Sequence, residues 1–254
     1  MLFAYWPFSQ FSPVSPRLRR TRPSLGKWKF NAAKSTLTGD TATIETAPDG
    51  MMQFSSQGFQ YKFKLDGKEY PTPDGGTTTW SATSPDVWDV TNRMKGKVAS
   101  SYHLVRKGDV LEITGKVAKP DGGTAQFASV YKRVSGGPAM TGKWRSTEVK
   151  PPMNVLEIAS TGADGVTLKD DTGPMFSSQF DGKDSPALGR MAGSKYTGAF
   201  RKIDANSFEL TVKLDGKPMF VEVYSVASDG KTLTLAGSPV NAKDEPYKLV
   251  FDRQ

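Results

Sequence analysis

The chain has 254 residues and a formal net charge of +8, and it contains one histidine and no cysteine. The lack of cysteine excludes disulfide bonds, thiol catalysis and cysteine-based metal centres, and a single histidine leaves zinc without its usual ligands. No segment reaches the roughly 18 apolar residues that a membrane-spanning helix requires. We therefore expect no metal, no cofactor and no membrane span.

The first 24 residues form the most basic part of the chain, with Arg17, Arg19, Arg20 and Arg22 and no acidic residue. Their apolar stretch precedes the arginines, whereas an export signal places its positive charges first. We predict that residues 1–24 are a disordered or processed basic leader outside the fold, and that the protein does not bind nucleic acid. The protein is periplasmic or secreted if this leader replaces an export signal, and cytoplasmic otherwise.

The rest of the chain contains one pattern twice, at a nearly constant offset. A repeat of about 110 residues is far longer than a solenoid unit and can form a domain of its own. The sequence therefore predicts two domains, residues 25–134 and 139–254, joined by a flexible link at residues 135–138. The matching segments are 26–29 and 142–145 (Gly-Lys-Trp-Lys and Gly-Lys-Trp-Arg), 65–68 and 180–183, 94–97 and 214–217, and 131–133 and 251–253.

Almost every element has the alternation of apolar and polar residues that is typical of β-strands. In the first copy, residues 88–94 and 111–117 alternate; in the second, residues 208–214 and 219–226 alternate around a hairpin turn at Asp215 and Gly216. No segment has helical periodicity. We expect an all-β fold of two tandem antiparallel up-and-down barrels, each with about eight strands, the number at which a closed barrel can hold one small ligand.

Each copy opens with Gly-x-Trp and closes with an arginine, Trp28 with Arg133 and Trp144 with Arg253. In these features each copy resembles the lipocalins and the wider calycin group. The segment at 26–35 also resembles the start of small lipocalin-like proteins of environmental bacteria. The resemblance implies that the first-strand tryptophan lies at the closed end of a barrel, with the last-strand arginine across it. Such a cation–π contact contributes about 1–2 kcal/mol, and we expect it to close each copy on itself.

The aromatic residues suggest a binding module for a small lipophilic molecule, held in one or both barrels. Asn92 falls on an inward position where the second copy has Val212, and a buried amide needs a partner. Filled barrels that present an apolar surface to another protein are a structural alternative. The candidate ligand-binding residues are Tyr61, Trp80, Trp88, Asn92, Tyr102, Phe208 and Tyr224.

His103 supports a second alternative, a hydrolase that acts on a lipophilic ester or lactone in a barrel mouth. As a general base, His103 would need a hydroxyl and a carboxylate beside it, and Ser100, Ser101, Asp86 and Asp89 are near it in the sequence. No Gly-x-Ser-x-Gly motif is present. The sequence does not decide whether the protein is an enzyme or what its oligomeric state is.

Overall fold

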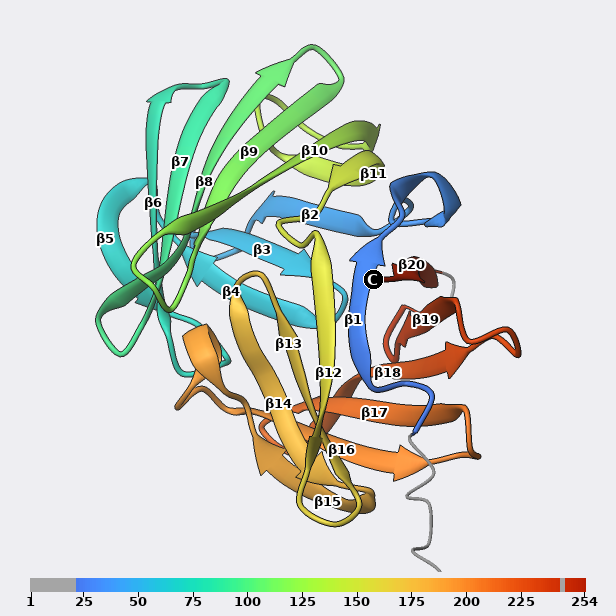
Figure 1. The fold of residues 1–254 in the computed structure, drawn as a ribbon. Coiled ribbons are helices and arrows are strands. Elements are labelled where there is room, and N and C mark those ends of the chain that lie inside the picture. Colours follow the sequence, from blue (N-terminus) through green and yellow to red (C-terminus); the bar gives the residue numbers. More distant parts are fainter. Residues whose placement is uncertain (1–21, 243–244) are drawn as a thin grey trace, which may run out of the picture.

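The computed structural model describes residues 22–242 and 245–254. It confirms the predicted fold class, because the chain forms two antiparallel sheets that each curl into a nearly closed barrel (Figure 1). Each sheet has ten strands rather than about eight. In the described part of the chain, helix is limited to two 3-10 turns, η1 (Ala32–Lys34) and η2 (Gly189–Met191).

One sheet, barrel B, is built from a continuous stretch of the chain. Its edges are β4 and β5, which follow each other in sequence but share no ladder. Its strands are β2 (Thr41–Thr46), β3 (Met52–Ser56), β4 (Phe59–Phe63), β5 (Asp66–Pro71), β6 (Thr77–Ser84), β7 (Val87–Met94), β8 (Lys97–Lys107), β9 (Val110–Ala118), β10 (Thr124–Ser135) and β11 (Gly142–Lys150).

The other sheet, barrel A, combines the first strand of the chain with its last nine. Its edges are β14 and β15, where the Ser185 hydroxyl donates to the Ser178 hydroxyl at 2.7 Å across the opening. Its strands are β1 (Gly26–Phe30), β12 (Val155–Thr161), β13 (Gly165–Asp170), β14 (Gly173–Gln179), β15 (Asp181–Pro186), β16 (Tyr196–Lys202), β17 (Ser207–Leu214), β18 (Lys217–Val226), β19 (Thr232–Pro239) and β20 (Tyr247–Arg253).

The two copies of the sequence repeat exchange their first strands. β1 lies between β12 and β20, both of the second copy, and β11 lies between β10 and β2, both of the first. In Figure 1 the blue β1 accordingly stands beside the yellow and red strands of barrel A. The barrels therefore divide the chain as 41–150 against 26–30 with 155–253, and not at the predicted boundaries of 25–134 and 139–254.

The predicted link at residues 135–138 does not connect the barrels. It belongs to the hairpin between β10 and β11, which pair within barrel B. The chain crosses between barrels at residues 31–40 and 151–154. Pro151 and Pro152 end β11 at the second crossing, because proline cannot donate a hydrogen bond to a ladder.

Each tryptophan of the Gly-x-Trp motif does meet an arginine, but the arginine belongs to the other copy. The guanidinium carbon of Arg253 lies 4.1 Å from the Trp28 ring centre, and that of Arg133 lies 4.1 Å from the Trp144 ring centre. The expected closure of each copy on itself is therefore wrong: each contact joins two neighbouring strands inside a sheet, β1 to β20 in barrel A and β11 to β10 in barrel B. The motif needs glycine because the arginine passes close: a Cβ at Gly142 would lie 2.9 Å from Arg133 Nη1.

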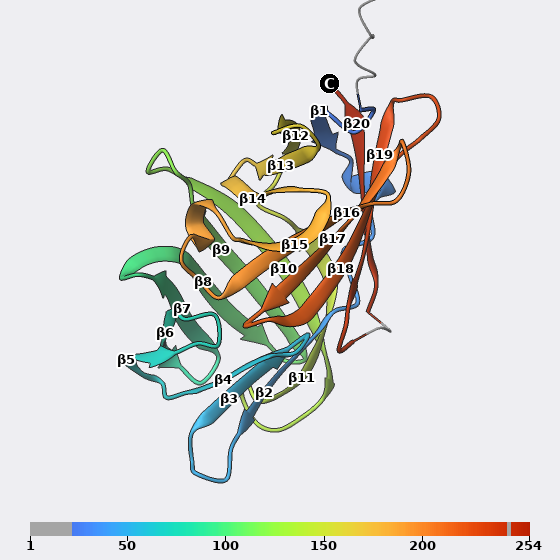
Figure 2. The ribbon, with the colours of Figure 1, turned by 90° about the horizontal axis from the view of Figure 1, so that it is seen from below.

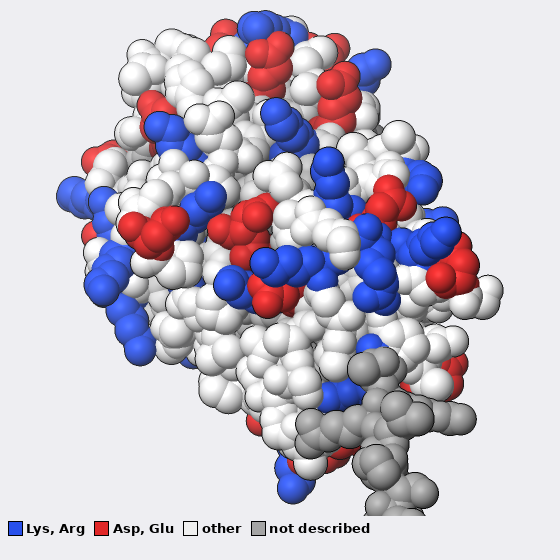
Figure 3. Space-filling view, in the orientation of Figure 1, with Lys and Arg blue, Asp and Glu red and all other residues white. Residues whose placement is uncertain are grey.

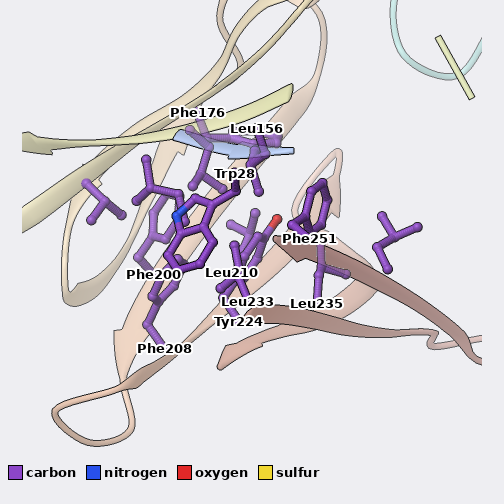
Figure 4. Close-up of a cluster of buried hydrophobic side chains, with 14 of the residues drawn as sticks. Trp28, Leu156, Phe176, Phe200, Phe208, Leu210, Tyr224, Leu233, Leu235 and Phe251 are labelled. Atoms are coloured by element: carbon purple, nitrogen blue, oxygen red, sulfur yellow. The ribbon is translucent and has the colours of Figure 1, made fainter. Parts of the chain in front are cut away.

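The exchanged tryptophans are central to the two hydrophobic cores. Trp28 and Trp144 are both fully buried, and their indole nitrogens donate to the carbonyls of Ser24 and Met140. Figure 4 shows Trp28 surrounded by large apolar side chains from β12 to β20, Phe251 among them. The first strand of the chain thus completes the core of barrel A.

Each sheet includes a short strand at an Asp-Gly pair, β5 at 66–67 and β15 at 181–182. Both pairs lie at the start of these strands, which pair with β6 and β16 through a bulge. A bulge accommodates an extra residue and increases the local twist. These short bulged strands increase the count in each sheet.

Positive and negative side chains are interspersed on the face of the molecule shown in Figure 3. In the described ranges no helix is long and apolar enough to cross a membrane. Of the predicted leader, residues 1–21 lie outside the described residues. Residues 22–24 pack on barrel A, where the Arg22 guanidinium donates to Ser160 at 2.9 Å and Ser24 is buried.

Candidate functional site

A cavity of about 670 Å³ lies between the two barrels and is lined by both. A volume of this size is typical of sites for small organic ligands. Leu37 and Thr38 of the first crossing segment complete its wall. Figure 2 shows the two barrels on either side of this region. Barrel B contributes Phe59, Tyr61, Asn92, Ser100, Tyr102 and Tyr131, among others, and barrel A contributes Phe176, Tyr196, Val212, Phe220, Glu222 and Tyr247.

Three of the seven candidate ligand-binding residues line this cavity: Tyr61, Asn92 and Tyr102. The other four lie in the cores. Trp80 stacks on Phe63 at 4.1 Å between ring centres and meets Trp88 edge-on at 6.1 Å. Phe208 stacks on Tyr224 at 4.7 Å. Large rings at inward positions therefore fill the barrels, and the space for a ligand lies where the barrels meet.

The tyrosines of the cavity are hydrogen-bond donors at neutral pH. Burial raises the pKa of Tyr196 to about 12, and it also raises the pKa of Tyr61, Tyr131 and Tyr247. Tyr131 uses its hydroxyl to donate to Asp40 at 2.9 Å. The walls thus combine aromatic rings with neutral hydroxyl groups.

Among the described residues, several buried polar atoms on the neighbouring strands β6 and β7 have no hydrogen-bond partner, and two of them belong to residues that face each other. They are Asn92 Oδ1 on β7 and Thr78 Oγ1 on β6, and these two residues are directly opposite each other in the ladder. The amide nitrogen of Asn92 makes a long contact of 3.3 Å with Ser100 Oγ. Buried polar groups normally find a protein or water partner; Asn92 also lines the cavity, whereas Thr78 is fully buried and is not part of the cavity wall.

On the barrel A side the cavity wall contains a carboxyl group, Glu222 on β18. It accepts hydrogen bonds from Tyr224 at 2.8 Å and from Tyr247 at 2.5 Å. Desolvation raises the pKa of Glu222, and the two tyrosine hydroxyls oppose that shift. Its remaining exposed surface faces the cavity, so a bound molecule can reach it.

Our reading of the sequence missed Glu222, Tyr247, Tyr131 and Asp40. One signal was available for Glu222, because it follows Phe220 and precedes Tyr224 on the inward face of an alternating strand. An acidic residue at an inward position is rare unless it has a partner or a function. Tyr247 and Asp40 gave no such signal, because they lie close to Glu222 and Tyr131 only in the folded chain.

His103 lies outside this cavity, on the outer face of barrel B. Its Nδ1 is 2.8 Å from Asp89 Oδ1, and both side chains are about half exposed, at 50% and 48%. Asp89 is its one recorded hydrogen-bond partner in residues 22–242 and 245–254. A groove of about 470 Å³ surrounds the pair, with Ser101, Thr114 and Lys116 in its wall. A hydrolase that used His103 would have to act in this outer groove and not in the cavity.

Ser100 and Asp86, the other residues considered with His103, are not in that groove. Ser100 lines the inner cavity, and Asp86 pairs with the Arg106 guanidinium, whose Nε is 2.7 Å from it. No group of three or more metal-binding side chains occurs in the described portions of the chain. Comparisons with protein-family models, with curated proteins and with solved structures found no match to this chain.

Proposed function

We propose that the protein binds a small, largely apolar molecule in the cavity between its barrels. The observation that carries this proposal is a partly open space of about 670 Å³ that aromatic side chains of both barrels line. Polar side chains in its wall, Glu222 and Asn92 among them, would orient a ligand that also has a polar end. The resemblance of each copy to lipocalin-like proteins supports the same proposal, with the difference that one site is shared by two barrels.

The alternative of filled barrels with an apolar docking surface has less support. The exposed large apolar side chains in the described residues are Val98, Val134 and Ile203, which belong to three separate segments. Single apolar residues of this kind are normal on a protein surface. Partly exposed apolar side chains such as Leu37, Phe59 and Phe220 line the cavity instead.

Binding can be tested with N-phenyl-1-naphthylamine, a neutral apolar dye whose fluorescence rises in an apolar site. We expect Ser100→Phe to weaken dye binding at least about tenfold, which corresponds to about 1.4 kcal/mol, because the larger ring occupies the cavity. The substitution fits the fold, since Ser100 and Phe220 have the same ladder position, opposite Asn92 and Val212 respectively. Val212→Phe should have the same effect from barrel A.

The matched controls are Ser101→Phe and Thr211→Phe, which place the same ring on the outer face of the same strands. Both should bind the dye as the unmodified protein does. Unchanged binding in the two cavity variants, or loss of binding in Ser101→Phe alone, would contradict the proposal, because it would move the site to the outer groove.

A further inference from the structure

Glu222 occupies a position that the fold does not require to be acidic. No ion pair with Lys, Arg or His is recorded for it within the described residues, and its two partners are neutral hydroxyls. Taking a carboxylate out of water without a cation is costly. A carboxyl group that is buried despite this desolvation cost, and that faces a cavity, is a candidate for a chemical role.

The duplication provides a matched site for comparison in the other barrel. Opposite Glu222 on the ladder is Gly237, and opposite Gly237 is Tyr247. In barrel B the same three positions hold Tyr102, Gly115 and Phe127. There Tyr102 and Phe127 form an edge-on aromatic pair at 5.1 Å. Two aromatic rings at these positions are therefore compatible with the fold. The pairing of the Glu222 carboxyl group with the Tyr247 phenol occurs in barrel A and not at the matching positions of barrel B.

The ring of Tyr247 occupies the space that a side chain at position 237 would fill, because that residue is Gly237. A Cβ at Gly237 would lie 2.1 to 2.5 Å from Cζ, Cε2 and the hydroxyl oxygen of Tyr247, so the ring lies directly against β19. This close approach brings the Tyr247 hydroxyl to Glu222. Tyr224, buried on the same strand as Glu222, holds the other carboxyl oxygen. The carboxyl group is thus fixed in orientation at the cavity wall.

We propose that Glu222 is a catalytic general base that removes a proton from carbon in a neutral, apolar substrate held in the cavity. The proposal rests on the proposed binding function and adds a reaction to it. The carboxylate takes the proton of a C–H group beside a carbonyl, the electron pair of that bond forms a C=C bond, and the π pair of the C=O bond moves onto the oxygen to give an enolate. A carbonyl compound with an acidic C–H beside the carbonyl fits this chemistry. Tyr247 is a positioning residue in this proposal.

The pH dependence follows from the groups around Glu222. Desolvation raises its pKa, and hydrogen bonds from Tyr247 and Tyr224 lower it. Other charged side chains line the same cavity but do not contribute to the shift in the pKa of Glu222. They are Asp40, Asp74, Arg93, Arg190 and Glu245. The rate should rise with pH as Glu222 loses its proton, with a midpoint above the ordinary pKa of glutamate.

The probe for this reaction is 5-nitrobenzisoxazole, which needs only a base. The carboxylate takes the C3 proton, the C–H electron pair completes a C≡N bond, and the N–O bond breaks with its electrons on the phenolate oxygen. The coloured cyanonitrophenolate is measured directly. We expect Glu222→Gln to lower the rate about 100-fold or more, within the usual range for a general base. Glu209→Gln, on the outer face of β17, should keep the full rate.

Two results separate this proposal from the proposed function. If the protein binds N-phenyl-1-naphthylamine but Glu222→Gln retains the elimination rate, or the intact protein has none, the base assignment is overturned and the binding function stands. If the dye does not bind, the binding function itself fails. Dye binding by Glu222→Gln shows that the variant keeps its cavity.

A stability measurement confirms that Glu222→Gln is folded and tests the environment of the carboxyl group. Because the pKa of Glu222 is raised in the folded state, the folded protein holds this proton at pH values where the unfolded chain has lost it. Stability from this group is therefore full below the unfolded pKa and declines as the pH rises through the folded pKa. The urea midpoint of Glu222→Gln, taken relative to that of the intact protein, should therefore rise with pH across this range. A constant difference would contradict the buried carboxyl group.

The role of Tyr247 is tested with Tyr247→Phe, which removes one hydrogen bond that lowers the Glu222 pKa. The midpoint of the pH–rate profile should move to higher pH. A purely structural role for Tyr247 would reduce the rate without moving the midpoint. An unchanged midpoint would therefore overturn the assignment of Tyr247 as a positioning residue, while Glu222→Gln remains the test of the base itself.

Discussion

Residues 36–150, produced alone, should fold into a stable barrel, and residues 25–134 should not. The first segment holds all ten strands of barrel B and the Arg133–Trp144 contact. The second follows the sequence repeat but lacks β11, so both β10 and β2 lose a neighbour and the core loses Trp144. An incomplete sheet with an open edge and an exposed core is marginal and prone to association.

The two segments can be compared by circular dichroism and by urea unfolding. Residues 36–150 should unfold cooperatively as a monomer, whereas residues 25–134 should be unfolded or associate by exchanging strands between chains. A cooperative monomeric fold of residues 25–134 would contradict the strand exchange, because it would show that β1 can complete its own copy.

Trp28→Ala should destabilise barrel A, and Trp144→Ala should destabilise barrel B. Both rings are fully buried, and removal of a buried tryptophan costs about 3–5 kcal/mol. Each variant also leaves an arginine without its indole, Arg253 in one case and Arg133 in the other. The damage should therefore appear mostly in the copy of the repeat that does not contain the mutated residue.

Amide hydrogen exchange resolved by residue measures where the damage falls. Trp28→Ala should lose protection in β16 to β20, and Trp144→Ala should lose it in β6 to β10. The two variants control for each other, because the same ring is removed from the same motif. Loss of protection in residues 41–135 of Trp28→Ala, with barrel A unaffected, would contradict the observed pairing.

The barrels themselves could be predicted from the chain, because each strand alternates and the repeat is visible. The tryptophan–arginine contact could also be predicted, as the motif occurs at the ends of both copies. Which arginine each tryptophan contacts could not be predicted. Trp28 and Trp144 lie in the same Gly-Lys-Trp motif, and Arg133 and Arg253 both lie near the end of the last strand of a copy, so the shared motifs do not encode which pair forms.

The segments that connect the strands decide which arginine each tryptophan contacts. Such segments give only weak signals in a sequence. Residues 136–141 are short enough for a hairpin, and this keeps β11 beside β10. Pro151 and Pro152 then follow the end of β11, and the chain continues into barrel A. We interpreted the glycine-rich segment as a link between domains, although a short Gly-rich connection between two strands is equally typical of a hairpin.

The cavity could not be predicted from the sequence, because its position and shape depend on how the two barrels meet. Asn92 and Tyr61 were recognised as inward residues of one barrel, and both line the cavity. Trp88 and Phe208 satisfy the same inward pattern but are enclosed by their own cores. Inward alternation thus identifies the interior of a barrel, and only the arrangement of both barrels separates cavity wall from core.

The shared cavity is tested by mapping N-phenyl-1-naphthylamine on the protein with residue-resolved amide NMR shifts. Binding should perturb strands of both barrels at once, around Asn92 and Tyr102 in barrel B and around Glu222 and Tyr247 in barrel A. Shifts confined to one barrel, or centred on His103 and the outer groove, would show that the site formed between the barrels is not where the protein binds apolar molecules.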